Sequence, residues 1–303
     1  MTDVLASVDR LDPDQVAGVR SLLSRCTEAD GVAPLNEDAR LALDGSPGDT
    51  VRHVVAHTAD GELIAYATVH GTTAQLAVDP AHRRRGLGSR LVAAVGPAHW
   101  WAFGNLPGAQ GLAARLGYVI TRELLVLERP VTGLGDPRPI PDTVAIRAFE
   151  AGRDEEAWLA VNARSFADHP EQGRTTAADL AARMAEPWFD PAGFLLAVDP
   201  AEPDRVLGFH WTKIDPAAPE VGEVYVLGVD PEAAGGGLGG VLLDAGLGHL
   251  VGRGVTTIEL YVEGDNTRAL RLYERAGFTV ANRDVTYAEP EQDGTPAERE
   301  LSQ

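Results

Sequence analysis

Apolar residues recur along this chain with two spacings, and each spacing predicts a different kind of element. Apolar positions three to four residues apart predict helices, whereas alternating apolar positions predict strands. In the first half they predict helices over 13–29, 36–43, 86–95 and 108–116, strands over 51–57, 62–69, 73–78 and 99–103, and a final strand pair over 118–128. In the second half they predict helices over 153–165, 176–185, 237–251 and 266–275, and strands over 144–148, 193–198, 205–214, 221–229, 256–262 and 278–287.

One pattern occurs twice. The segments "LAVDPAHRRRGLGSRLVAAV" (76–95) and "LGVDPEAAGGGLGGVLLDAG" (227–246) each predict an apolar strand, Val-Asp-Pro, a short loop, Gly-Leu-Gly and a helix. Downstream, "ARLGYVI" (114–120) corresponds to "ERAGFTV" (274–280). Such self-similarity indicates two similar domains. Because Pro and Gly are frequent around 128–143, we expect domains at 1–130 and 143–288, a linker at 131–142 and a disordered acidic tail at 289–303.

Charge and composition exclude several classes of partner. A formal net charge of −19 argues against nucleic acid and anionic membranes, which bind clustered Lys and Arg, and suits an amine-bearing small substrate. Many cytosolic proteins are acidic without such a role. Cys26 is the only cysteine, so neither an internal disulfide nor a cysteine metal cluster can form, and we expect no metal. With no signal-peptide pattern and no apolar stretch of membrane-spanning length, we expect a soluble, cytoplasmic protein, and a monomer.

The second repeat contains five glycines in six positions, Gly235 to Gly240. Bare backbone ahead of a helix lets N–H groups approach an anion. The loop matches the dinucleotide fingerprint G-x-G-x-x-G. In a Rossmann site, however, the first glycine directly follows the strand, whereas here residues 230–234 intervene, and the corresponding loop of the first repeat lacks the fingerprint. These two observations exclude a Rossmann site. The chain has no P-loop motif. A plain helix start would explain one such loop, but it explains two in matched surroundings poorly.

The feature that both loops share resembles motif A, R/Q-x-x-G-x-G/A, of the GCN5-related N-acetyltransferase (GNAT) family. In that motif, backbone N–H groups and a helix N-terminus bind the pyrophosphate of acetyl-CoA. Arg83, Arg85, Gly86 and Gly88 match it in the first repeat, whereas Ala234 replaces the Arg or Gln in the second. The resemblance implies an α/β fold of two tandem GNAT domains, each a mixed, largely antiparallel sheet flanked by helices, with acetyl-CoA as co-substrate.

The segment "ELYVEGDNTRALRLYERAGF" (259–278) is similar to the family's motif B. Asn266, Leu270 and Tyr273 fall on one helix face, which can present Asn266 and Tyr273 to the cofactor. A tyrosine there can protonate the departing CoA thiolate, since its ordinary pKa of about 10 keeps the proton at neutral pH. The alternative is that Tyr273 is an ordinary packing residue.

Glu223 lies on the predicted strand "VGEVYVLGV", where we expect it to share a face with Tyr225, Leu227 and Val229. This carboxylate is a candidate general base that takes a proton from an amine, directly or through water. An unshifted carboxyl is a weak base for that task, so burial would have to raise its pKa, or water would have to relay the proton. The alternative is a solvent-facing strand acid.

The repeat provides an internal comparison between the halves. When Val229 is aligned with Val78, Glu223 corresponds to Thr72, and when Gly277 is aligned with Gly117, Tyr273 corresponds to Ala113. Neither Thr72 nor Ala113 can perform the proposed acid–base chemistry. We therefore expect the first domain to bind acetyl-CoA without catalysis and the second to be catalytic, with Glu223 and Tyr273 as its catalytic residues.

The tandem arrangement resembles the GNAT acetyltransferases of mycothiol biosynthesis, which acetylate the cysteinyl amine of cysteinyl-glucosaminyl-inositol in the last step. The resemblance implies substrate contacts from Glu37, Asp168, Lys213, Glu223 and Tyr261, and with Glu37 contributed by the other domain it implies a substrate site between the domains. Glu37 could equally be an exposed glutamate at a helix start, with Asn36 or Asp38 the residue meant. The implied acetyl-CoA contacts are Leu76, Ala77, Val78, Arg84, Arg85, Gly86, Leu87, Gly88 and Ser89 in the first domain, and Leu227, Gly228, Val229, Ala234, Gly235, Gly236, Gly237, Leu238, Gly239, Gly240, Asn266, Thr267, Arg268, Ala269, Leu270 and Arg271 in the second.

Two alternative functions share these cofactor features. One is an acetyltransferase for another amine, such as an aminoglycoside or a protein N-terminus. The other is a non-catalytic acetyl-CoA sensor. The presence of Glu223 and Tyr273 in one half argues against the sensor, and the substrate stretches argue against the other amines.

Overall fold

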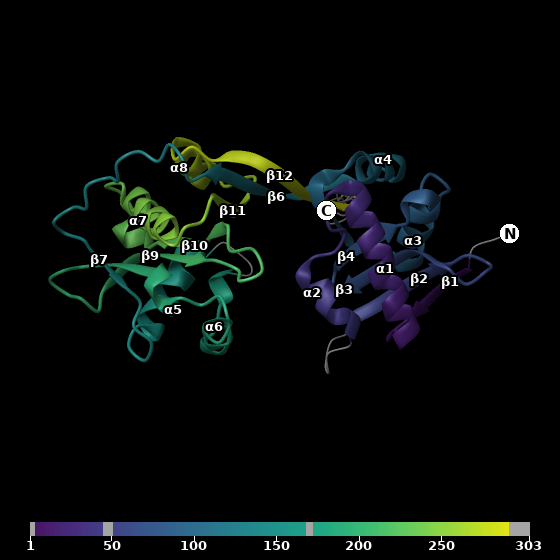
Figure 1. Ribbon diagram of the computed structural model, residues 1–303, viewed down its shortest axis with the longest axis horizontal. Coiled ribbons are helices and arrows are strands. Elements are labelled where there is room, and N and C mark those ends of the chain that lie inside the picture. The colour runs from purple at the N-terminus through teal and green to yellow at the C-terminus, as the bar shows by residue number, and fades with distance from the viewer. Residues whose placement is uncertain (1–3, 45–50, 168–171, 291–303) are drawn as a thin grey trace, which may run out of the picture. The chain divides into compact units, whose positions relative to one another are not determined.

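The computed structural model describes residues 4–44, 51–167 and 172–290. The chain forms two compact units (Figure 1). Unit 1 comprises residues up to Leu124 together with the segment from Asn282 onward, and unit 2 comprises Leu125–Ala281. Each unit is a sheet with helices on both faces, and the two follow one plan.

The sheet of unit 1 has the strand order β1-β2-β3-β4-β5-β12. Neighbouring strands run antiparallel except β4 and β5, which run parallel where Thr73 and Ala74 lie opposite His99 and Trp100. The strands are β1 (Val4–Val8), β2 (Val51–His57), β3 (Leu63–His70), β4 (Thr73–Val78), β5 (His99–Ala102) and β12 (Thr279–Ala288).

Helices cover both faces of this sheet. On one face lie α1 (Pro13–Asp30) and α2 (Glu37–Leu41), where Leu22 of α1 and Leu35, just before α2, join one cluster with Val55 and Tyr66. On the other face, α3 (Leu87–Val95) and α4 (Pro107–Leu116) enclose a second apolar cluster. Asp12 caps the N-terminus of α1, where its carboxylate accepts the N–H of Gln15, and Gly31, with φ +71°, follows the last residue; these are the expected signals at the two ends of a helix.

Unit 2 repeats this order as β7-β8-β9-β10-β11-β6. Strands β10 and β11 are its parallel pair, as β4 and β5 are in unit 1. The strands are β7 (Ala145–Ala148), β8 (Phe194–Val198), β9 (Val206–Lys213), β10 (Val221–Val229), β11 (Thr257–Glu263) and β6 (Val119–Pro130). The helices are α5 (Glu155–Ser165), α6 (Ala177–Met184), α7 (Leu238–Gly252) and α8 (Thr267–Arg275). Helices α5 and α6 pack on an aromatic core around Trp158 and Trp211, and α7 and α8 pack on an aliphatic core around Leu243 and Ile258.

Most predicted elements form within a residue or two of the expected bounds, with two exceptions. Strand β1 was not predicted, because its five residues are mostly exposed and their pattern carries little signal. The strand pair expected over 118–128 is one continuous strand, β6, since no turn residue interrupts it.

The compact units do not coincide with the halves of the repeat. Strand β12 is the last strand of the second repeat, yet its residues from Asn282 onward belong to unit 1, where Val285–Tyr287 pair with β5. Residues Leu125–Pro130 of β6, the last strand of the first repeat, belong to unit 2. The domain bounds expected from the sequence stay a prediction, and most of the predicted tail, 291–303, lies outside the described residues.

Candidate functional site

The glycine loop of unit 2 joins β10 to α7 with an unusual backbone. Gly235, Gly236 and Gly237 have φ angles of +124°, +57° and +81°, which L side chains rarely adopt. A Cβ added at any of the three would point into open space. Backbone conformation, and not crowding, therefore calls for glycine here. These three glycines place no side chain of the loop over the N-terminus of α7, a geometry suited to an anion such as pyrophosphate.

The corresponding loop of unit 1 reaches a similar shape with different residues. Gly86 has φ +84°, and Arg84 has φ +62° although it carries a side chain. Arg83 donates from Nε to the carbonyl of Val78 at 3.0 Å and from both terminal nitrogens to Asp30 at 2.7 Å. The motif arginine of unit 1 thus ties the loop to β4 and α1, a restraint that Ala234 cannot supply in unit 2.

An arginine–aspartate anchor is repeated beneath both loops. Asp79 and Asp230, which follow β4 and β10, are both buried. Arg25 of α1 donates to Asp79 at 2.6 Å, and Arg164 of α5 donates to Asp230 at 2.5 Å. The hydrogen bond from Arg164 lowers the pKa of Asp230. For Asp79, burial acts to raise the pKa, but hydrogen bonds from His82 and Arg25 outweigh burial, so the pKa is lowered. Each anchor fixes the end of the strand from which the glycine loop departs.

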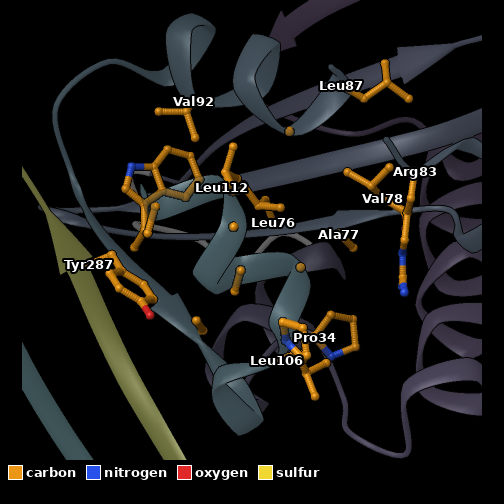
Figure 2. Close-up of a pocket in the computed structure, with 18 of the residues that line it drawn as sticks. Pro34, Leu76, Ala77, Val78, Arg83, Leu87, Val92, Leu106, Leu112 and Tyr287 are labelled. Carbon is orange, nitrogen blue, oxygen red and sulfur yellow. The ribbon is translucent and has the colours of Figure 1, made fainter. Parts of the chain in front are cut away.

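A pocket of about 720 Å³ lies in unit 1 beside its loop (Figure 2). Its walls include every acetyl-CoA contact expected in the first domain except Arg85, which instead donates to the carbonyl of Ala81. Tyr287 of β12 forms part of the wall, across the pocket from Arg83 in Figure 2. Its hydroxyl donates to Asn105 at 2.8 Å. Strand β12 thus completes a pocket built mainly from the first 120 residues, which the sequence pattern did not indicate.

A β-bulge on β10 corrects one expectation. Val224 lies opposite Thr212 of β9, but Val226 lies opposite Trp211, so Tyr225 is an extra residue. A bulge of this kind reverses the alternation of side chains along the strand. Glu223 and Tyr225 therefore face the aromatic core under α5 and α6, whereas Leu227 and Val229 face α7. The prediction that all four share one face is wrong.

Glu223 forms an ion pair with Lys213, its partner across β9 and β10. Lys213 Nζ lies 3.4 Å from Glu223 Oε2, and the side chains are 23% and 16% exposed. Burial raises the pKa of Glu223, and Lys213 opposes that rise. Burial acts to lower the pKa of Lys213, but the attraction of Glu223 outweighs it and raises that pKa. Lys213 Nζ also lies 5.4 Å from the ring centre of Trp188 and 5.5 Å from that of Tyr225.

Tyr273 is buried on the other face of the same sheet. It packs edge-on against Phe278 and belongs to the apolar cluster that contains Val224 and Leu227, which flank the bulge. Burial raises its pKa to about 12, so the phenol holds its proton at neutral pH. Glu223 and Tyr273 thus approach β10 from opposite faces of the sheet.

The other residues expected to contact acetyl-CoA or the substrate lie on several different elements. Asn266 caps α8 by accepting the N–H of Ala269 at 3.1 Å, so part of its role is structural. Tyr261 lies on β11 and is 50% exposed. In unit 1, Glu37 is the first residue of α2. Asp168 lies outside the described residues. No sequence pattern pointed to Arg183, whose Nε donates to the Tyr225 hydroxyl at 3.0 Å, or to Trp188.

Within the described ranges, no three His, Cys, Asp or Glu side chains are grouped as metal ligands. No helix among the described residues is long and apolar enough to cross a membrane.

Comparison with known proteins defines the class. Residues 157–278 match the acetyltransferase (GNAT) family and residues 49–120 match an acetyltransferase (GNAT) domain. The fold is similar to a GCN5-related N-acetyltransferase from Sphaerobacter thermophilus, with a TM-score of 0.70, 24% identity and 93% of this chain and 94% of that chain covered. A tandem GNAT protein from the clavulanic acid pathway gives a TM-score of 0.68 with 19% identity, covering 96% and 100%. The fold prediction is confirmed: the protein is an acyltransferase with two tandem GNAT domains.

Curated relatives narrow the assignment further. The mycothiol acetyltransferase of Geodermatophilus obscurus is 50% identical, covering 94% of this chain and 97% of its own length. That of Salinispora arenicola is 49% identical, covering 92% and 94%, and that of Rhodococcus jostii is 47% identical, covering 92% and 96%. The chain therefore belongs to the mycothiol acetyltransferase family. The resemblance stated from the sequence is confirmed.

Proposed function

We propose that this protein is a mycothiol synthase: it transfers the acetyl group of acetyl-CoA to the cysteinyl amine of cysteinyl-glucosaminyl-inositol, in the last step of mycothiol biosynthesis. Similarity to full-length mycothiol acetyltransferases supports the substrate. The observation that carries the chemistry is the Lys213–Glu223 pair beside the bulge of β10, in the unit whose loop is built almost wholly of glycine. We also propose that the protein acts in the cytoplasm as a monomer.

The residues of unit 2 divide the reaction between them. The amine attacks the thioester carbonyl, a C–N bond forms and the C–S bond breaks. Glu223 accepts a proton from the nitrogen, directly or through water, and its raised pKa makes it a better base than an exposed glutamate. Tyr273 donates a proton to the leaving thiolate. The backbone of Gly235–Gly240 and the N-terminus of α7 bind the pyrophosphate, where open space over three glycines fits close approach of an anion.

The acceptor groups of the substrate suit the side chains around Glu223. Carboxylates bind an ammonium group, and Lys213, held against two aromatic rings, can donate to hydroxyl groups of the sugar and inositol. Asp168, Glu37 and Tyr261 complete the substrate contacts in this proposal.

Unit 1 binds acetyl-CoA in the pocket of Figure 2 without catalysing transfer. Strand pairing corrects the correspondence expected from the sequence: because β4 has no bulge, Thr73, opposite His70, and not Thr72, occupies the position that Glu223, opposite Lys213, has in unit 2. Ala113 corresponds to Tyr273 by alignment of Gly117 with Gly277. Neither Thr73 nor Ala113 can exchange a proton in the required range.

The test is acetyl-CoA-dependent release of CoA by the purified full chain with cysteinyl-glucosaminyl-inositol, beside a panel of aminoglycosides and peptide amines. Strong preference for the thiol glycoside is expected. Release of CoA only with other amines would reject the substrate but keep the class. Binding of acetyl-CoA with no turnover on any amine would favour a sensor.

A further inference from the structure

A second, half-buried carboxylate, that of Glu259, lies beside Glu223. Strands β10 and β11 run parallel, with Glu223 directly in register with Glu259. Residues in register on neighbouring strands project from the same face, with backbones about 4.8 Å apart. Glu259 therefore lies on the face that carries Glu223 and Lys213, and alternation places Tyr261, an expected substrate contact, on that face two residues further along β11.

The charges on this face do not balance. Lys213 on β9 pairs with Glu223 on the side away from β11, at 3.4 Å. Glu259 is half-buried, and the charged groups that act on it are Glu223 on β10, Glu128 on β6 and, more weakly, Lys213. Burial raises the pKa of Glu259, and the nearby charges of Glu223 and Glu128 raise it further. Arg183 also reaches this face, but its Nε donates to the Tyr225 hydroxyl, so the face keeps negative charge at Glu259 that Lys213 does not neutralise.

An amine substrate supplies the missing cation. The α-amino group of a cysteinyl residue has an ordinary pKa near 8, so it arrives mostly as ammonium at neutral pH. Acetylation removes two protons from that nitrogen, one before the attack and one as the amide forms. The negative charge of Glu223 is largely neutralised by its ion pair with Lys213, so Glu223 binds a cation more weakly than Glu259 does. Among the charged groups that act on Glu259, none forms such a pair with it.

Resting on the proposed function, we propose that Glu259 binds the ammonium group of the substrate and accepts its first proton, which leaves Glu223 to accept the second. The first proton passes from Glu259 to solvent, and the neutral amine attacks the thioester. The second passes to Glu223 and from there to solvent, and a proton from solvent replaces the one that Tyr273 gives to the CoA thiolate. One amide, one CoA thiol and one released proton result, so the reaction balances.

The experiment is a pH profile of kcat/KM for the amine at saturating acetyl-CoA, from about pH 6 to about pH 9, spanning the α-amino pKa. The full-length variants are Glu259→Gln, Glu223→Gln and, as a control for loss of one carboxylate, Glu274→Gln on the exposed surface of α8. We expect kcat/KM of Glu259→Gln to fall about tenfold or more at the acid end, because this variant can use only the small fraction of amine that is already neutral in solution. At the alkaline end its kcat/KM should recover to within about twofold of wild type. Glu223→Gln should lose activity at both ends, and Glu274→Gln at neither.

A loss in Glu259→Gln that is equal at all pH values, or no loss beyond that of Glu274→Gln, would overturn the proposal. Glu259→Asp, which keeps the charge, should regain most of the acid-end activity; a profile like that of Glu259→Gln would also overturn it. Wild-type turnover tests the proposed function separately: if another amine is the substrate, the same profiles with that amine still decide the role of Glu259. No turnover with any amine would overturn both.

Discussion

Gly86 and Gly237 occupy the same backbone position in the two units, with φ of +84° and +81°, each immediately before a helix that begins with Leu. A Cβ at either position would meet nothing within 4 Å. The two positions are therefore a matched pair, in which the same substitution strains the same conformation in one unit at a time.

Gly86→Val and Gly237→Val should have similar effects on stability, but only Gly237→Val should lower turnover. Each forces a branched residue to positive φ, which costs about 1–2 kcal/mol. Gly237→Val should abolish most turnover by disturbing the loop of the catalytic unit. Gly86→Val should leave the rate per folded molecule within about twofold of wild type. Thermal unfolding and steady-state kinetics measure both, and a selective collapse of the rate in Gly86→Val would show that unit 1 takes part in catalysis.

Arg164→Ala should destabilise unit 2 by about 2 kcal/mol, because it leaves the buried carboxylate of Asp230 without its partner. The figure is lower than for a fully buried pair since Arg164 is half exposed. Chemical denaturation measures the effect. Arg164→Ala combined with Asp230→Asn should recover part of the loss, and failure to recover any would mean that Arg164 stabilises through packing and not through its charge.

Tyr273→Phe should lower kcat by about 100-fold at neutral pH, the usual contribution of a general acid, while KM for acetyl-CoA changes little. The phenyl ring keeps the packing against Phe278, so stability should be maintained. Rapid-mixing kinetics and calorimetric binding of acetyl-CoA separate the two effects. Unchanged kcat would assign Tyr273 a packing role only.

Lys213→Gln should move the acid limb of the kcat profile to higher pH. Lys213 holds down the pKa of Glu223, which burial raises, so its removal raises that pKa further. A base works only when deprotonated, and the midpoint of the limb follows its pKa. Lys213→Arg retains the charge and serves as the control. An acid limb at the same pH in both variants would show that another group sets it.

Most helices and strands of this fold could be predicted from the sequence, because the patterns that mark their ends lie within short segments. The Val-Asp-Pro and Gly-Leu-Gly segments mark a strand end and a helix start within 12 residues of each other, in both halves. Gly235 to Gly237 were singled out by composition, and their positive φ angles supply the physical reason.

Features that depend on pairing between distant residues were not predictable in the same way. The bulge at Tyr225 shows only when β10 is laid against β9, and it reverses which residues share a face. Tyr287 reaches the pocket of unit 1 through pairing with Trp100, a partner 187 residues earlier in the chain. Neither relationship leaves a periodic signal within the strand itself.

The most direct test of the account is to measure, on one preparation of Glu223→Gln, both the number of acetyl-CoA molecules bound and the rate of acetylation of cysteinyl-glucosaminyl-inositol. Two bound equivalents are expected, one in each unit, with turnover reduced about 100-fold or more. Turnover close to wild type with both sites filled would contradict it, because the proton from the amine would then leave by a route that does not include Glu223.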